Sequence, residues 1–194
     1  PKVQGGVMGA AFVPGMDTLL LGADQLTAVD AKDGKQLWTN PIKGAQTFAF
    51  TADGKTGAAG GWGKNAGAFS LADGKGDAVS FEAVVGGMTF LPNGDVAVAV
   101  WGGTHPLYAL RGDHKKAETL FQSRFGFQNV AWSDALKGLV AAEEGGKLWL
   151  LDADGKPKAE LDETAGTTPY RMLLQGGDVL LGRMNRVVQR VKVQ

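Results

Sequence analysis

Hydrophobic and polar residues alternate along this chain in short runs that are separated by turn residues. In "AVDAKDGKQLW", residues 28–38, an alternating run reaches Asp30, turns at Asp33-Gly34 and leaves through Trp38. Asp-Gly and Asn-Gly pairs accept the positive φ of tight turns, so such runs predict β-hairpins. No stretch longer than eight residues shows helical periodicity. The pattern therefore predicts an all-β chain.

This hairpin is one copy of a repeat. Related segments follow it as "FSLADGKGDAVSF", "YALRGDHKKAETLF" and "WLLDADGKPKAEL". The turn aspartates Asp33, Asp73, Asp113 and Asp154 are spaced 40, 40 and 41 residues apart. A second hairpin precedes each copy, as in "MTFLPNGDVAVAV", and a further one, "RMLLQGGDVLLG", opens a fifth unit. Four short strands repeated every ~40 residues predict the blades of a β-propeller.

The strands of each unit differ in polarity in the way that a blade requires. The second strand is apolar on both faces ("DVAVAV"), which suits a strand between neighbouring sheets, and the fourth is more polar, which suits an outer edge. We predict a single domain, 1–194, of five four-stranded blades: 8–42, 46–84, 87–125, 128–164, and 168–194 together with 1–4. The strand at 1–4 is expected to complete the last blade and close the ring. The alternative is a window of a seven- or eight-bladed propeller.

The repeat also resembles that of a known superfamily. "AVDAKDGKQLW" is similar to the PQQ-like repeat of the quinoprotein-dehydrogenase-like propellers, in which an Ala, an Asp, a Gly-Lys turn and a Trp recur at this spacing. The matching residues are Ala28, Asp30, Gly34, Lys35 and Trp38. The resemblance implies a propeller in which the Trp docks one blade on the next. WD40-like repeats have a similar length, but their "GH…WD" signature is missing here.

The resemblance extends to the fold and not to catalysis. Its quinone enzymes are longer, eight-bladed and need a calcium site near the cofactor, and nothing in this chain matches that site. A non-enzymatic member of the superfamily is therefore favoured. The resemblance also favours an exported, periplasmic or extracellular bacterial protein, and Pro1 is compatible with removal of a signal peptide.

Composition narrows the partners. Lys+Arg and Asp+Glu both total 20 among 194 residues, so no net charge steers the chain towards nucleic acid. The absence of cysteine excludes disulfides, thiolate metal sites and a cysteine nucleophile. No apolar run approaches the ~20 residues that a membrane span needs. We expect a protein partner or a small ligand, whereas the oligomeric state is left open.

Chemistry-bearing residues gather in two sets of loops: those between the second and third strands, and those that join successive units. Aromatic surface with convergent polar groups is typical of a binding face. The residues we predict for ligand or partner binding are Trp62, Trp101, His105, Tyr170, Arg171, Arg183, Arg186, Gln128 and Glu143. Alternative roles stay open, since the tryptophans can cap gaps between blades and the arginines can pair with Glu143 and Glu144. At the opposite end, the Asp, Gly and Lys residues of the turns are of the types that tight turns require, and their charges are expected to be solvated.

Three enzyme classes fit this set poorly. Five-bladed glycosidases need carboxylates on the innermost strands, where this chain offers Met8, Gln46, Met88, Gln128 and Arg171. A hydrolytic triad has only His105 and His114 as bases, and these two cannot build a metal site from opposite faces.

We therefore predict a non-catalytic binding or scaffold module without metal or cofactor, a candidate subunit or domain of a larger bacterial assembly. The alternatives are a small cofactor-dependent enzyme, quinoprotein-like or lyase-like, with its pocket at the channel mouth, and a fragment of a larger propeller protein.

Overall fold

The computed structural model of this chain describes residues 5–163, 169–183 and 186–192. Strands are its only extended regular elements, so the predicted all-β class is confirmed. The strands form five antiparallel sheets, and each sheet consists of strands that are consecutive in the chain. The predicted count of five blades is likewise confirmed, and we number the sheets as blades 1 to 5.

The strand bounds follow the 40-residue repeat. Blade 1 contains β1 (Gly9–Phe12), β2 (Thr18–Gly22), β3 (Leu26–Asp30) and β4 (Gln36–Asn40). Blade 2 contains β5 (Ala45–Phe50), β6 (Thr56–Gly61), β7 (Asn65–Ser70) and β8 (Val79–Ser80). Blade 3 contains β9 (Val84–Phe90), β10 (Val96–Trp101), β11 (Leu107–Leu110) and β12 (Ala117–Phe121). Blade 4 contains β13 (Phe127–Ser133), β14 (Gly138–Glu143), β15 (Lys147–Leu151) and β16 (Pro157–Glu163). Blade 5 contains β17 (Pro169–Gln175), β18 (Asp178–Arg183) and β19 (Val188–Lys192).

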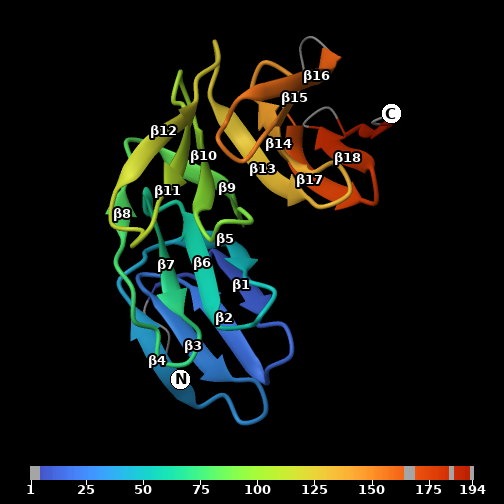
Figure 1. Cartoon of the computed structure of the whole chain (residues 1–194). Coiled ribbons are helices and arrows are strands. Elements are labelled where there is room, and N and C mark those ends of the chain that lie inside the picture. Colours follow the sequence, from blue (N-terminus) through green and yellow to red (C-terminus); the bar gives the residue numbers. More distant parts are fainter. Residues whose placement is uncertain (1–4, 164–168, 184–185, 193–194) are drawn as a thin grey trace.

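The blades stand side by side in an arc (Figure 1). The first strand of each blade, β1, β5, β9, β13 or β17, lies on the concave side, and the last strands lie on the convex side. The main contacts between blades join each blade to the next one in the chain. The molecule is thus a curved row of sheets that face one another.

Apolar clusters fill the four junctions between blades. Leu20 and Leu26 of blade 1 share a cluster with Phe69 of blade 2, and each of the three is at most 1% exposed. The other three junctions hold clusters of the same kind. Burying one such Leu or Phe side chain stabilises the fold by roughly 1.5–3 kcal/mol. The stability of the arc therefore comes from packing between blades.

Trp38 fastens blade 1 to blade 2. Its ring contacts Phe69 edge-on, with centroids 5.6 Å apart, and its Nε1 donates to the carbonyl of Leu71 at 3.1 Å. Nearby, Asn40 Nδ2 donates to the carbonyls of Gly74 and Gly76. The docking role that the repeat implies for this Trp is present at this junction. Phe81 and Phe121 hold aromatic contacts at the matching places of blades 2 and 3.

The Asp-Gly-Lys segments form the predicted turns. The side chains of Asp33, Asp53 and Asp73 each accept a hydrogen bond from the backbone N–H of the lysine two residues later. Gly34, Gly54 and Gly74 between them adopt positive φ, a region that suits glycine. Turn chemistry therefore accounts for the recurring Asp and Lys.

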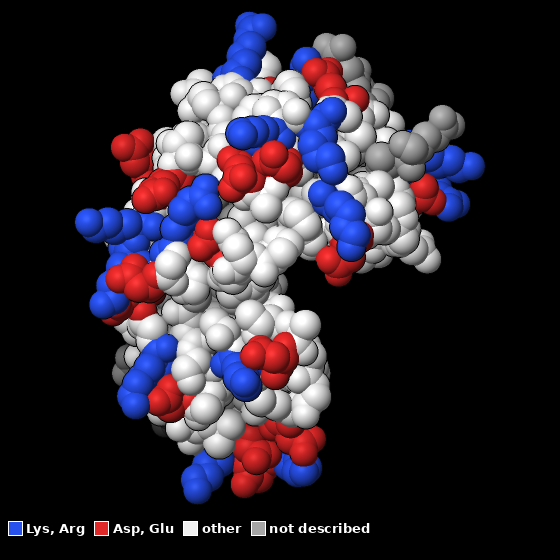
Figure 2. Space-filling model, viewed as in Figure 1, with Lys and Arg blue, Asp and Glu red and all other residues white. Residues whose placement is uncertain are grey.

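The described part of the chain leaves the ring open. Figure 1 shows β1 and β17 on opposite sides of an opening, and Figure 2 shows a hollow on the same side of the surface. The strand predicted at 1–4, which was expected to close the ring, lies outside the described residues. Blade 5 accordingly has three described strands.

Candidate functional site

Two faces of the arc can be told apart by their loops. Loops that follow the second strand of a blade and loops that enter the first strand lie at one end of the sheets, which we call the loop face. Turns that follow the first and third strands lie at the other end, which we call the turn face. The antiparallel order of the strands fixes this division.

Trp62 and Trp101 meet on the loop face at the junction of blades 2 and 3. Their rings contact edge-on at 88°, with centroids 6.0 Å apart, and Trp62 is 51% exposed. The backbone N–H of Trp62 donates to the carbonyl of Gly44, which fixes the loop at the entrance of β5. The two predicted tryptophans thus form one rigid aromatic patch, partly open to solvent.

A cavity of about 490 Å³ lies beside this aromatic patch. Met8, Asp24, Lys43 and Trp62 line it together with glycine and alanine backbone. Its lining combines the apolar side chains of Met8 and Trp62 with a carboxylate and an ammonium group. The cavity suits a ligand with an apolar group flanked by charges of both signs.

His105 lies in the same region. Its Nδ1 is 3.7 Å from the Glu82 carboxylate, whose side chain is 86% exposed. Burial, and then the nearby Glu82 carboxylate, raise the pKa of the Tyr108 hydroxyl. Because the Glu82 carboxylate is open to water, a partner carrying a cation can reach it.

Glu143 is a buried carboxylate in blade 4. It is 1% exposed, and its Oε2 accepts hydrogen bonds from Ser123 Oγ at 2.9 Å and Trp149 Nε1 at 2.8 Å. A cavity of about 360 Å³ borders it, lined also by Arg124 and Phe125. The predicted side chain therefore belongs to a built network at the loop face.

Adjacent Glu144 points elsewhere. Its Oε1 accepts from the backbone N–H of Gly102 in blade 3 and so ties blade 4 to the loop that follows Trp101. Glu144 lies in the turn that follows β14, and both neighbouring carboxylates contact segments of blade 3, Glu143 through Ser123 and Glu144 through Gly102.

The three predicted arginines do not form one cluster. Arg171 lies with its guanidinium carbon 4.9 Å from the Tyr170 ring centre and lines a cavity of about 320 Å³ on the concave side. Arg183 is buried, and its Nε donates to Gln189 at 2.7 Å. Arg186 adopts a φ of 66° in the turn after β18. The bond of Arg183 within its own blade takes the place of the expected pairing with Glu143, which is engaged elsewhere.

A β-bulge recurs at the loop-face end of the innermost strands. The register shifts at Gln46, Gly86, Gln128 and Tyr170, one residue in each of blades 2 to 5. Bulges change the direction of side chains and increase the strand twist. They are common at the rims of sheets and next to functional sites. Gly86 and Tyr170 therefore replace Met88 and Arg171 as the structural equivalents of Gln46 and Gln128.

Gln128, one of the predicted binding residues, has a side-chain oxygen without a hydrogen-bond donor in the described part of the chain. The residue is 5% exposed. Next to it, Asn129 Nδ2 donates to the carbonyls of Pro169 and Tyr170 in blade 5.

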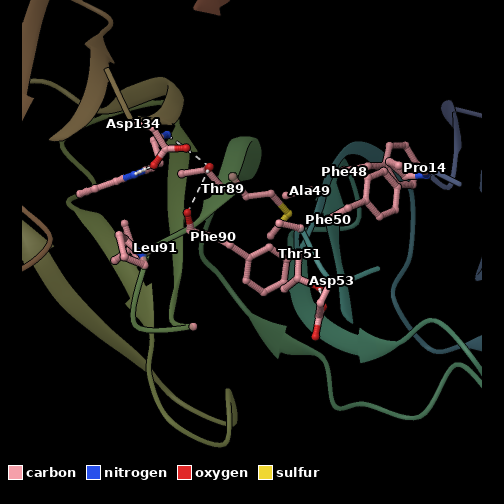
Figure 3. A pocket seen from close by; sticks show the side chains of 15 residues that line it. Pro14, Phe48, Ala49, Phe50, Thr51, Asp53, Thr89, Phe90, Leu91 and Asp134 are labelled. Atoms are coloured by element: carbon pink, nitrogen blue, oxygen red, sulfur yellow. Dashed lines mark hydrogen bonds between the residues drawn. The ribbon is translucent and has the colours of Figure 1, made fainter. Parts of the chain in front are cut away.

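The turn face carries a cavity that the sequence did not indicate. It measures about 750 Å³, and Figure 3 shows Phe48 and Phe50 of β5 on one side and Thr89 and Phe90 of β9 on the other. Trp132, whose Nε1 donates to Asp134, also lines it. The available signal is an aromatic residue that recurs just before the first turn of units 1 to 4, as in "FAFTADG" and "MTFLPNG".

Two further searches of the described residues gave negative findings. No group of three or more His, Cys, Asp or Glu side chains is placed to hold a metal ion among the residues described. Within the same ranges, no helix has the length and apolarity to span a membrane.

No known protein family model and no curated protein matches this sequence. Solved structures do match its fold. The β-propeller domain of Cps50 (Swd1) from Myceliophteria thermophila matches 97% of the chain with a TM-score of 0.79 and 16% identity. Hydrazine synthase from Kuenenia stuttgartiensis matches 94% with a TM-score of 0.74 and 16% identity. The computationally designed Ika8 protein matches 98% with a TM-score of 0.76 and 14% identity.

These likenesses show that the chain has a β-propeller fold. The chain spans 65%, 58% and 59% of the lengths of those three structures, about three fifths in each case. The fold is thereby established, and at such low identity it carries no activity with it.

Proposed function

We propose that this protein is a non-catalytic binding module that holds a protein partner on its loop face. The observation that carries the proposal is the exposed Trp62, braced edge-on by Trp101 beside a cavity of about 490 Å³. A large aromatic side chain that is already held rigidly at the surface loses little conformational entropy on binding. Aromatic residues of this kind often contribute most of the binding free energy of a protein interface.

The spread of cavities over the loop face supports an extended partner. The cavity beside Trp62 belongs to blades 1 and 2, the one beside Arg171 lies on the concave side, and the one beside Glu143 belongs to blades 3 and 4. A compact small molecule fills one such cavity, whereas a polypeptide segment reaches several. A protein partner is therefore favoured over a metabolite.

The surface charges set the chemistry of that partner. Lys43 and Asp24 line the same cavity, and Glu82 lies next to His105. Figure 2 shows Lys, Arg, Asp and Glu mixed over the visible face without a field of one sign. We infer a partner segment with an apolar anchor flanked by residues of both charges. Such a scaffold role fits a subunit or domain of a larger bacterial assembly and a PQQ-like or WD40-like repeat.

The alternative of a cofactor-dependent enzyme has less support. His105 and Glu82 approach at 3.7 Å, and among the described residues they belong to no group of three or more His, Cys, Asp or Glu side chains that could hold a metal ion. The name hydrazine synthase belongs to an enzyme of the same fold at 16% identity, which is too distant to carry the activity over.

The experiment selects peptides from a phage-displayed random library on the wild-type protein and measures their affinities by fluorescence anisotropy. We expect Trp62→Ala and Lys43→Ala to weaken the selected peptides by roughly tenfold or more, while the melting temperature stays unchanged. Leu37→Ala is the matched control, because Leu37 is 49% exposed but lies on the outer strand β4.

Three results contradict the proposal. Selected peptides that bind Trp62→Ala as tightly as wild type place the binding surface elsewhere. Selected peptides that bind Thr89→Ala more weakly than wild type instead place the binding surface at the turn-face cavity. Loss of folding in Trp62→Ala, read from its circular dichroism, shows that the ring is structural.

A further inference from the structure

The exposed hydrophobic side chains of this molecule concentrate on its first and last blades. Nine of the eleven large hydrophobic residues that are exposed in the described ranges belong to blade 1 or blade 5. They are Val7, Met8, Phe12, Met16, Leu37, Tyr170, Leu173, Val187 and Val188. Soluble surfaces rarely gather apolar groups in this way unless something covers them.

Blade 1 leaves open the face that each later blade packs against its predecessor. Phe12 pairs with Leu19 in register, as Phe90 pairs with Val96 and Trp132 with Leu139. Phe90 and Trp132 pack into the junction with the preceding blade, whereas Phe12 is 68% exposed.

The partners of these rings in register show the same contrast. Val96 and Leu139, which pair with Phe90 and Trp132, are fully buried at the junctions with their preceding blades. Leu19 occupies the same register position in blade 1 and is only partly buried. Blade 1 therefore has the side chains of a junction without the neighbouring blade.

Blade 5 leaves the opposite face open. In blade 4, Asn129 follows the bulge and donates to two carbonyls on the first strand of the next blade. Arg171 follows the equivalent bulge in blade 5 and is exposed. Leu173 and Val188 on the same side of this sheet are 62% and 76% exposed.

The width of the opening indicates what fits there. The five blades superpose on the larger β-propeller domain of Cps50 (Swd1) with a TM-score of 0.79 and cover 65% of it. An arc with that curvature leaves room for about two or three more blades of ~40 residues. A second copy brings five blades at once, which is too many for the sector.

We propose that two or three further blades of the same polypeptide, continuing the 40-residue repeat, pack between blade 5 and blade 1 and complete the ring. All four observed junctions join blades that are consecutive in one chain, and the two open faces continue that interface. The first added blade covers Leu173 and Val188, and backbone carbonyls of its first strand accept hydrogen bonds from Arg171. The last added blade covers Phe12.

The test begins with the intact mass of the protein isolated from its source. The expected mass exceeds the 20.2 kDa of these residues by at least roughly 9 to 13 kDa, the size of two or three blades. An intact mass of 20.2 kDa overturns the proposal, whether the chain is then a monomer or a dimer by light scattering.

The second arm compares variants in that intact protein and in the isolated 194-residue chain. Phe12→Ser and Leu173→Ser are expected to lower the melting temperature of the intact protein by roughly 5 °C or more and to leave the isolated chain unchanged. Phe50→Ser, in the junction of blades 1 and 2, should lower the melting temperature in both forms.

The variant data also distinguish further blades from other structures that could cover the open faces of blades 1 and 5. If the intact protein is larger but Phe12→Ser and Leu173→Ser leave its melting temperature unchanged, the extra residues do not cover these faces and the proposal is wrong. If either variant dissociates a dimer of the isolated chain, a second copy is the occupant and the proposal is equally wrong.

Discussion

At the scale of the single residue, Glu143 is a buried charged group held in place by two hydrogen bonds. Its carboxylate is buried and accepts hydrogen bonds from Ser123 and Trp149, which belong to different loops and strands of the region. A buried acceptor that satisfies two donors fixes the geometry around it, because removing it leaves both donors without a partner.

We expect Glu143→Ala to lower the free energy of unfolding by roughly 1–3 kcal/mol, since the Trp149 Nε1 donor loses its acceptor. Glu143→Gln keeps an acceptor oxygen and should recover most of that loss. Urea denaturation measures both values. Glu82→Ala is the control, because that side chain is 86% exposed, and an equal effect there contradicts the argument.

Asp73 provides a pH-dependent prediction. Hydrogen bonds from the Lys75 side chain, and then from Ser70, lower the pKa of the Asp73 carboxyl from 3.8 to about 2. Because the folded pKa is below the ordinary value, the interaction stabilises the fold above about pH 4. The contribution is lost as the pH falls through about 2.

Carboxyl carbon NMR should therefore show Asp73 titrating near pH 2 in the wild-type protein. In Lys75→Ala the midpoint should move up towards 3.8, since the largest cause of the shift is gone. A midpoint that stays near 2 in the variant means that Ser70 and the backbone dominate instead. The Asp73 side chain is 43% exposed, so little change in global stability is expected.

Single residues were also where the sequence was most and least informative. The Asp-Gly-Lys turns and the docking of Trp38 were predictable, because both rest on local chemistry within one hairpin or on a repeat motif. The contact between Trp62 and Trp101 was not, since their loops are 39 residues apart and meet only through the angle between blades 2 and 3. Strand alternation predicts that Glu143 and Glu144 point to opposite sides, but Glu144 lies in the turn after β14 and both side chains contact blade 3.

At the scale of the element, the innermost strands depend on glycine for their close approach. Gly86 lies at the bulge of β9, where a Cβ would collide with the carbonyl oxygen of Gln128 in the next blade. The collision is with backbone, which cannot rotate away as a side chain can. The strands β9 and β13 can lie at their observed separation only because this position has no side chain.

We expect Gly86→Ala to destabilise the protein by roughly 1–3 kcal/mol or more and to widen the junction of blades 3 and 4. Thermal unfolding measures the first effect, and faster hydrogen exchange in β9 and β13 reports the second. Gly6→Ala is the matched control, because a Cβ there meets nothing within 4 Å. Similar destabilisation in both variants refutes the steric explanation.

The strands themselves were predictable from alternation and turn signals, but the bulges were not. The bulge residues are two glutamines, a glycine and a tyrosine, Gln46, Gln128, Gly86 and Tyr170, and they lie where successive innermost strands meet at the loop-face rim. This meeting of strands is a property of assembled blades and leaves no local pattern. The turn-face cavity escaped prediction for the same reason, since its aromatic residues come from different blades.

At the scale of the whole molecule, the row of blades resembles a one-dimensional array. Blades 2, 3 and 4 each pack against two neighbours, and blades 1 and 5 each pack against one in the described arc. In such an array the local stability is approximately the sum of a unit's own stability and its junctions. Blades 1 and 5 are therefore expected to have a lower local stability than blades 2, 3 and 4.

Native-state hydrogen exchange on the 194-residue chain should show this gradient. We expect the slowest exchange in β10 and β14, whose residues are almost entirely buried, and faster exchange in β2 and β18. Uniform protection over all five blades contradicts the array description, because it requires a cooperative unit that spans the opening.

The five-blade count was predictable because the repeat period is visible in the sequence. The open arc was not, since strand patterns describe each blade and say nothing of the angle between blades. That angle comes from the bulk of the side chains at the junctions, such as Leu20 and Phe69, against the glycines of the innermost strands.

The order of the strands has a consequence for synthesis. Every sheet is built from neighbouring stretches of chain, and every junction joins one sheet to the next. A nascent chain can therefore form its first hairpins and dock each completed unit while later units are still being made, without waiting for a distant segment. We expect the chain to fold in increments of about 40 residues as it leaves the ribosome.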